Sequence, residues 1–173
     1  QTYPSIQYLI IDGASKDNTL ELVRELAPEA EVYSERDKGI YDAMNKGLDR
    51  ATGDYVWYLN AGDVQASPTA VEDLVQATCT GDSLPDVLYG DTRLIDAEDH
   101  DLGLRRLRPP HQLDWRSFRA GMLVCHQAFV AKRSISPRYD LRYRFSADVD
   151  WCIRVLKEAM TTAFYPEPIA LYL

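Results

Sequence analysis

Acidic side chains follow two short apolar runs of this sequence, at places where such groups can bind a ligand. Asp12 ends the run "IQYLII", and Asp63 closes "LNAGD", which overlaps the end of the run "YVWYL". A carboxylate such as Asp12 can accept hydrogen bonds from a nucleobase or a ribose, and Asn60 and Asp63 offer oxygen ligands suited to Mg²⁺ or Mn²⁺. Both stretches also consist of residue types common in turns, so a purely structural role stays open for each.

A second group of acids lies in "FSADVDW". Asp148 and Asp150 would occupy the first turn of a helix, where the helix dipole favours negative charge whatever the function. The same place suits a general base that takes a proton from a hydroxyl. Asp150 stands four residues before Arg154 and is expected to pair with it, which leaves Asp148 as the freer carboxylate. His126, in "CHQAF", is either an active-site group or a buried histidine with satisfied hydrogen bonds.

Alternating strands and helices would position these residues. Apolar runs predict strands, and apolar residues at helical spacing predict helices. The predicted order is strand 6–11, helix 18–26, strand 31–34, helix 40–51 and strand 55–59, with a third helix after Ser67. This alternation predicts an α/β fold with a mostly parallel sheet flanked by helices. Ligands of such sheets bind at the carboxyl ends of the strands. Asp12, Asp63 and the acids Glu35 and Asp37 are therefore expected at one edge.

The second half of the chain has a less regular pattern. "DVLYGDTRLID" is typical of a strand with a bend, and "CHQAFVAKR" alternates as a strand does. Ser146 would cap a last helix, whose buried face is expected to carry Val149, Ile153, Leu156 and Met160. We find no repeat and no linker, so the pattern favours one domain.

Composition narrows the function classes. The chain has 173 residues, 46% of them apolar, a net charge of −8 and a pI of about 4.8. This charge argues against a nucleic-acid binder, which usually carries a basic face. The three cysteines have no C-x-x-C spacing, so neither a zinc site nor a disulfide framework is indicated, and a cytoplasmic location is the simplest expectation. No apolar run reaches the roughly 18 residues of a membrane-spanning helix.

Three ordered motifs together resemble the family 2 glycosyltransferases of the GT-A fold. They are "YLIIDGASKDNTLELV", "SERDKGIYDAMNKGLDRATGDYVWYLNAGD" and "FSADVDWCIRVLKEA". The likeness is to bacterial enzymes that build exopolysaccharide, such as colanic acid, and lipid-linked repeat units. It implies transfer of a sugar, with inversion, from a nucleotide-diphospho-sugar to a hydroxyl of a glycan or a lipid-linked saccharide.

The resemblance also implies roles for individual residues. Asp148 matches the general base, Asp63 the ligand of Mg²⁺ or Mn²⁺, and His126 a segment on the acceptor side. The residues matched to the nucleotide-sugar pocket are Asp12, Gly13, Glu35, Asp37, Lys38 and Asn60. Gly62 stands where the family often has an acid, so Asn60 would help the metal only indirectly.

Further expectations concern the extent of the domain. The nucleotide-sugar half is expected at about residues 1–95 and the acceptor half at about 96–173, with a first strand and helix of the family missing before Gln1 and a segment missing after Leu173. A homodimer would be one way to complete such a domain. The basic run "RRLRPPH" leaves contact with the inner face of a membrane open as a minority alternative.

Two rival functions were weighed. A phosphotransferase of the haloacid-dehalogenase type needs a second aspartate two residues after Asp12, and Ala14 stands there. A degenerate domain that binds nucleotide-sugar without catalysis, or that only dimerises, remains the alternative.

Overall fold

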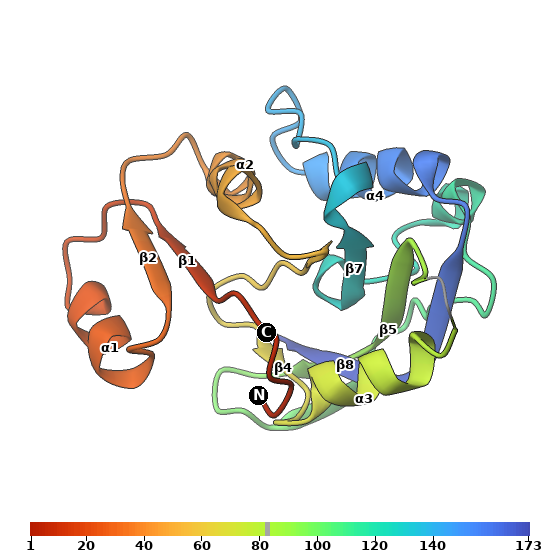
Figure 1. Ribbon diagram of the computed structural model, residues 1–173, viewed down its shortest axis with the longest axis horizontal. Helices are drawn as coiled ribbons and strands as arrows, with labels where there is room; N and C mark the ends of the chain where they lie inside the picture. Colours follow the sequence, from red (N-terminus) through yellow and green to blue (C-terminus); the bar gives the residue numbers. More distant parts are fainter. Residues whose placement is uncertain (82–83) are drawn as a thin grey trace.

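A parallel pair of strands forms the amino-terminal part of the fold. The computed structural model describes residues 1–81 and 84–173. β1 (Leu9–Asp12) pairs with β2 (Glu31–Ser34), and α1 (Thr19–Leu26) connects them. α2 (Ile40–Arg50) follows β2 and contacts β1, and Figure 1 shows α1 beyond the outer side of this pair. The predicted order of strand, helix, strand and helix is confirmed here to within a few residues.

The remaining strands form one mixed sheet. Its strands run in the order β3-β7-β5-β8-β4, and β6 pairs with β5. β5 and β8 are parallel, whereas the other ladders of this sheet are antiparallel. The α/β fold with flanking helices is confirmed, but within the described residues parallel pairing is confined to β1–β2 and β5–β8. The strands are β3 (Tyr55–Val56), β4 (Val64–Gln65), β5 (Val87–Ile95), β6 (Asp101–Leu104), β7 (Phe129–Lys132) and β8 (Thr162–Tyr172).

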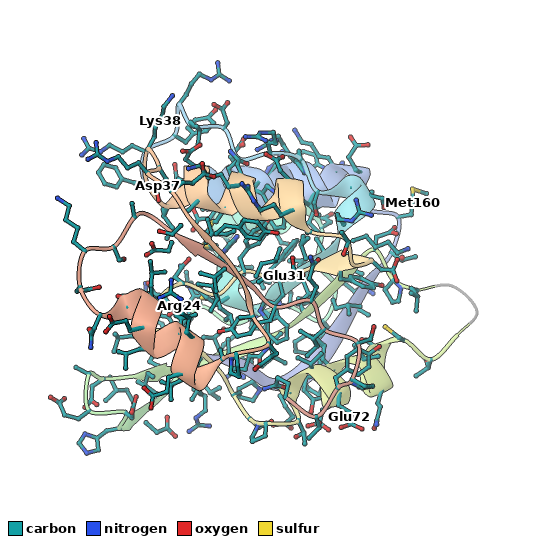
Figure 2. The ribbon with its side chains drawn as sticks, turned by 60° about the vertical axis from the view of Figure 1, so that its left-hand side comes forward. Arg24, Glu31, Asp37, Lys38, Glu72 and Met160 are labelled. Atoms are coloured by element: carbon teal, nitrogen blue, oxygen red, sulfur yellow. The ribbon has the colours of Figure 1, made fainter. Side chains whose placement is uncertain are left out.

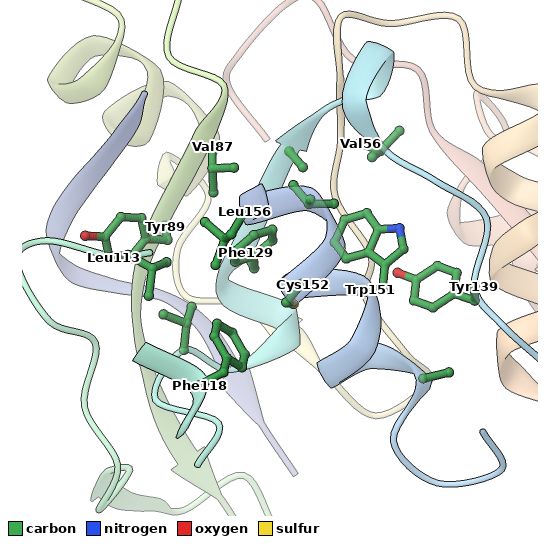
Figure 3. Packing of buried hydrophobic residues seen from close by; sticks show 14 of the residues in the cluster. Val56, Val87, Tyr89, Leu113, Phe118, Phe129, Tyr139, Trp151, Cys152 and Leu156 are labelled. Carbon is green, nitrogen blue, oxygen red and sulfur yellow. The ribbon is translucent and has the colours of Figure 1, made fainter. Parts of the chain in front are cut away.

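Alternation along β5 places one helix on each face of this sheet. Val87 and Tyr89 belong to a core cluster with α4 (Ala147–Glu158), whereas Leu88 packs on the other face with Leu74 of α3 (Ala70–Thr78). Successive side chains of a strand point to opposite faces, which explains this division. Trp151 of α4 is fully buried in the first cluster (Figure 3). Short 3₁₀ turns at Trp115–Ala120, His126–Ala128 and Arg133–Ile135 complete the fold.

Several sequence predictions about elements need correction. α4 ends at Glu158, so Met160 is 89% exposed and not part of the buried face (Figure 2). The strand predicted at 55–59 is regular only at Tyr55–Val56, and "CHQ" leads into a 3₁₀ turn before β7. The long strand β8 was not predicted. Asp150 and Arg154 do pair, with Oδ2 and Nε 2.7 Å apart.

The structure also bears on two expectations from composition. Cys79, Cys125 and Cys152 are all free thiols, as expected. Among residues 1–81 and 84–173, no helix has both the length and the apolar character needed to cross a membrane.

Candidate functional site

The carboxylate of Asp12 joins the carboxyl ends of β1 and β2. Its oxygens accept hydrogen bonds from Ser15 N at 3.0 Å and Ser34 Oγ at 2.6 Å, and Ser15 Oγ donates to it as well. The hydrogen bonds from Ser15 and then Ser34 lower the pKa of Asp12 despite its burial. The side chain is therefore an ionised group that stabilises its own turn, which is the structural alternative foreseen for it. Contact with a nucleotide base remains a prediction.

The loops after β1 and β2 converge, as the parallel pairing predicts. A Cβ atom at Gly13 would lie 2.7 Å from Oδ2 of Asp37, so the two loops approach closely and a larger residue would displace the Asp37 side chain. Oδ1 of Asp37 accepts a hydrogen bond from Gly39 N at 2.8 Å. Asp37 and Lys38 lie in the loop before α2 (Figure 2). Asp12, Gly13 and Asp37 thus form one patch beside the end of β1.

Glu35 and Lys38 are less well placed for a shared pocket. Glu35 accepts from Arg50 at 3.2 Å and lies 3.7 Å from Lys46, so its charge is paired with α2. Lys38 is exposed, and its backbone N–H donates to the carboxylate of Asp42 at 3.0 Å. Their nucleotide-sugar contacts remain predictions.

A cavity of about 170 Å³ lies between α2, the start of α4 and the segment around His126. Three predicted site residues line it: Asn60, His126 and Asp148. Asp12, Gly13, Glu35, Asp37 and Lys38 are not among its lining residues. The other lining residues are Ile40, Tyr41, Met44, Arg105, Met122, Cys125, Gln127 and Tyr172.

Asp148 lines this cavity and has hydrogen-bond partners at one of its two carboxylate oxygens. Its Oδ1 atom accepts hydrogen bonds from Tyr41 Oη at 3.1 Å and from Val149 N at 2.9 Å. Its Oδ2 atom accepts none from the described part of the chain. Burial and then the charge of Asp148 raise the pKa of Tyr41, which therefore stays protonated and donates. Asp148 is thus oriented through one oxygen and open at the other, as a general base needs to be.

His126 is a buried neutral imidazole at the back of the cavity. It is 3% exposed, its Nε2 atom lies 2.7 Å from Tyr139 Oη, and its ring stacks on Tyr58. Burial lowers the pKa of His126 to about 4, although the nearby Asp148 charge acts in the opposite direction. Its contacts match a histidine with satisfied hydrogen bonds, the alternative left open by the sequence. An acceptor-side role remains a prediction.

The loop that carries Asp63 is held by backbone and side-chain contacts. Asp63 N donates to Asn60 O at 3.0 Å, and Gln127 Nε2 donates to Asp63 Oδ2 at 2.6 Å. Oδ1 of Asp63 accepts no hydrogen bond from the residues described. A hard divalent cation fits this donor set, because the free carboxylate oxygen and the side chain of Asn60 are the kind of ligand that Mg²⁺ and Mn²⁺ take alongside substrate oxygens.

Another acidic group lies in the turn between β5 and β6. Ligand atoms of Asp96, Glu98 and His100 lie within 4.8 Å of one another. However, the carboxylate of Asp96 already accepts from the backbone N–H groups of Glu98 and His100. The three side chains therefore lie close together because they belong to a hydrogen-bonded turn of the hairpin between β5 and β6.

Several residues of the site were not predicted from the sequence. Tyr41 carries no chemical signal of its own within the predicted helix 40–51, and Arg105 belongs to the basic run "RRLRPPH". Gln127 directly follows His126, which is the one signal that could have drawn attention to it. Tyr172 lies in the unpredicted strand β8.

Comparison with known proteins identifies the family. The model of glycosyl transferase family 2 matches residues 1–138, and the chain belongs to this family. A PGL/p-HBAD biosynthesis glycosyltransferase of Mycobacterium bovis is 31% identical in an alignment 182 residues long. The alignment covers 99% of this chain and 67% of the relative. An uncharacterized glycosyltransferase of Mycobacterium tuberculosis is 32% identical over 155 residues, which cover 86% of this chain and 56% of the relative.

Solved structures confirm the GT-A-like fold. S. aureus TarS 1-349 in complex with UDP-GlcNAc has a TM-score of 0.74 at 14% identity, over 99% of this chain and 51% of that chain. Glucosyl-3-phosphoglycerate synthase from Mycobacterium tuberculosis, in complex with Mn²⁺, UDP and glucosyl-3-phosphoglycerate, has a TM-score of 0.58 at 17% identity, over 96% of this chain and 61% of that chain. This chain therefore spans about half to three fifths of these solved proteins.

Proposed function

We propose that the chain transfers a sugar from a nucleotide-diphospho-sugar to a hydroxyl of a saccharide, free or lipid-linked, with inversion at the anomeric carbon. The observation that carries this proposal is the open oxygen of Asp148 in a cavity that Asn60 also lines. Family membership and the UDP-GlcNAc bound to TarS support a nucleotide-sugar donor.

The reaction would be one displacement. Asp148 Oδ2 takes the proton of the acceptor hydroxyl, whose oxygen forms a bond to the anomeric carbon as the bond to the diphosphate oxygen breaks. The nucleoside diphosphate leaves with the bonding electron pair. Attack from the face opposite the leaving group inverts the configuration. Tyr41 keeps the carboxylate oriented through Oδ1.

Asp63 would hold the divalent cation with indirect help from Asn60, and Asp12, Gly13 and Asp37 would contact the nucleoside. A bound cation supplies Lewis-acid stabilisation of the departing diphosphate. Gln127 fixes the Asp63 carboxylate for this purpose.

The test is Asp148→Asn, with Asp150→Asn as the matched control because Asp150 is paired with Arg154. Loss of a well-placed base costs about 10²–10⁴ in rate. We expect kcat to fall by that factor in Asp148→Asn, with donor affinity by calorimetry within about twofold, and to stay near wild type in Asp150→Asn. Turnover by Asp148→Asn within a few-fold of wild type would contradict the role.

Calorimetry also separates transfer from the non-catalytic alternative. We expect UDP- or GDP-sugars to bind the wild-type protein more tightly with Mn²⁺ than without it, and to be turned over. Binding without any turnover of a panel of acceptors would favour the degenerate binding domain.

A further inference from the structure

Arg105 is the only Lys or Arg side chain among the described residues that line the cavity. It follows β6, and its backbone N–H donates to Thr92 O at 3.2 Å. The residue is half-buried. The cavity therefore contains one fixed positive charge, since the buried His126 is neutral at neutral pH.

The guanidinium of Arg105 is only partly used by the protein. Its Nη2 atom donates to Met122 O at 3.2 Å, and within the described part of the chain it forms no ion pair. Two nearby arginines are paired, since Arg108 pairs with the buried Asp91 and Arg93 pairs with Asp101, whereas the exposed Arg106, like Arg105, forms no ion pair within the described residues. An arginine has five N–H donors in a planar fork, so Arg105 keeps several for a ligand.

Asp148 lines the same cavity but does not neutralise Arg105, because the two form no ion pair. A half-buried cation without a carboxylate partner costs desolvation energy, and an anionic ligand would offset that cost. Phosphate matches the geometry of the arginine fork through two parallel hydrogen bonds.

We propose that Arg105 binds a phosphate group of a substrate in this cavity. The identity of that substrate rests on the proposed function. The phosphate would come either from the diphosphate of the donor or from a phosphate-linked acceptor.

The test compares Arg105→Gln with Arg106→Gln. Both remove one positive charge at adjacent positions, but Arg106 is exposed and does not line the cavity. We expect Arg105→Gln to weaken binding of UDP and inorganic pyrophosphate about tenfold or more by calorimetry, with Arg106→Gln within about twofold of wild type. Arg105→Lys should fall in between, because lysine keeps the charge but loses the fork.

A second arm identifies the source of the phosphate. If UDP and pyrophosphate bind normally to Arg105→Gln, the variant should instead raise KM for a polyprenyl-diphosphate-linked saccharide about tenfold, with no change for the same saccharide without phosphate. Equal behaviour of Arg105→Gln and Arg106→Gln in both arms would overturn the proposal. So would a wild-type protein that binds none of these phosphate compounds.

Failure of the proposed function would look different. If pyrophosphate binding depends on Arg105 but no nucleotide-sugar is turned over, the anion site stands and the transferase proposal fails. Far-UV circular dichroism and thermal midpoints of the variants check the fold. If Arg105→Gln does not fold, Arg105→Lys decides the test, and lysine binding as tightly as arginine would then contradict the forked contact.

Discussion

Gln127 fixes the carboxylate of Asp63 through a hydrogen bond of 2.6 Å from Nε2 to Oδ2. The side-chain amide is itself oriented, because Cys125 Sγ donates to Gln127 Oε1 at 3.0 Å, and Trp57 Nε1 holds the backbone of Gln127 by donating to its main-chain carbonyl at 2.8 Å. The thiol, the side-chain amide and the carboxylate are therefore linked by two successive hydrogen bonds. The thiol donates to the amide oxygen, and the amide nitrogen donates to the carboxylate. Oδ1 of Asp63 is left open toward a ligand.

Removal of this support should weaken metal binding. We expect Gln127→Ala to lower Mn²⁺ affinity about 10- to 100-fold, the usual effect of losing a residue that orients a metal ligand. Calorimetry or electron paramagnetic resonance with Mn²⁺ alone measures it without turnover. Gln76→Ala is the control, because Gln76 is exposed and, among the described residues, its side chain hydrogen-bonds to Glu72 alone. Unchanged Mn²⁺ affinity in Gln127→Ala would show that Asp63 does not need this contact.

Tyr41 should contribute to turnover through Asp148. We expect Tyr41→Phe to lower kcat about tenfold, consistent with loss of a hydrogen bond to a charged group worth ~1.5 kcal/mol. Donor affinity should not change. Tyr143→Phe, at an exposed tyrosine, serves as the control. In an Asp148→Asn background the Tyr41 change should have little further effect, since coupled residues are non-additive. An undiminished tenfold loss there would mean that Tyr41 acts independently of Asp148.

His126 should make stability depend on pH. Burial lowers its pKa from 6.5 to about 4, so below pH 6.5 the unfolded chain binds a proton that the folded chain does not. Stability from this residue is complete above pH 6.5 and declines as the pH falls to about 4, by ~3 kcal/mol in total. Urea unfolding across this range measures the decline.

The controls for this pH effect are His126→Gln and His100→Gln. His126→Gln should remove the decline in the free energy of unfolding between pH 6.5 and about 4 that comes from His126. His100→Gln, at an exposed histidine, should keep this decline. The same slope in wild type and His126→Gln would assign the pH dependence to other groups.

Trp151 should be the side chain on which the larger core depends most. It is 0% exposed, it stacks on Tyr139, and its Nε1 atom donates to Pro137 O at 2.7 Å. Trp151→Ala should lower the free energy of unfolding by about 3–5 kcal/mol. Trp115→Ala should cost less, because Trp115 is half-buried beside cationic side chains. Denaturant titration compares them, and equal losses would contradict this ranking.

The sequence predicted the first half of the fold well because its signals are local. Apolar runs and helical spacing predicted β1, β2 and the helices to within a few residues, and their parallel order predicted that Asp12 and Asp37 lie at one edge, where the loops after β1 and β2 do converge. β8 was missed because Pro166 and Pro168 interrupt its pattern. These prolines lie where its pairing with β5 changes register, so the strand accommodates them through an irregularity.

The site was predicted only where single residues carry a chemical signal. Asp148, Asn60 and His126 do line one cavity. Arg105 and Gln127 could not be found in this way, because their importance depends on contacts between segments distant in sequence. Gln127 reaches Asp63 across 64 positions, and Arg105 meets Met122 only after the chain turns back.

Gly62 adopts a positive φ of 96°, and a Cβ atom there would lie 3.0 Å from Leu173 Cδ2. An acid at this position would therefore need both a strained backbone and a displaced neighbour. A single mutation is a poor route to a two-acid loop in this protein. The one-acid loop is therefore linked to the residue that follows β8, and an engineered second acid would need a backbone change at Gly62 together with a smaller side chain at position 173.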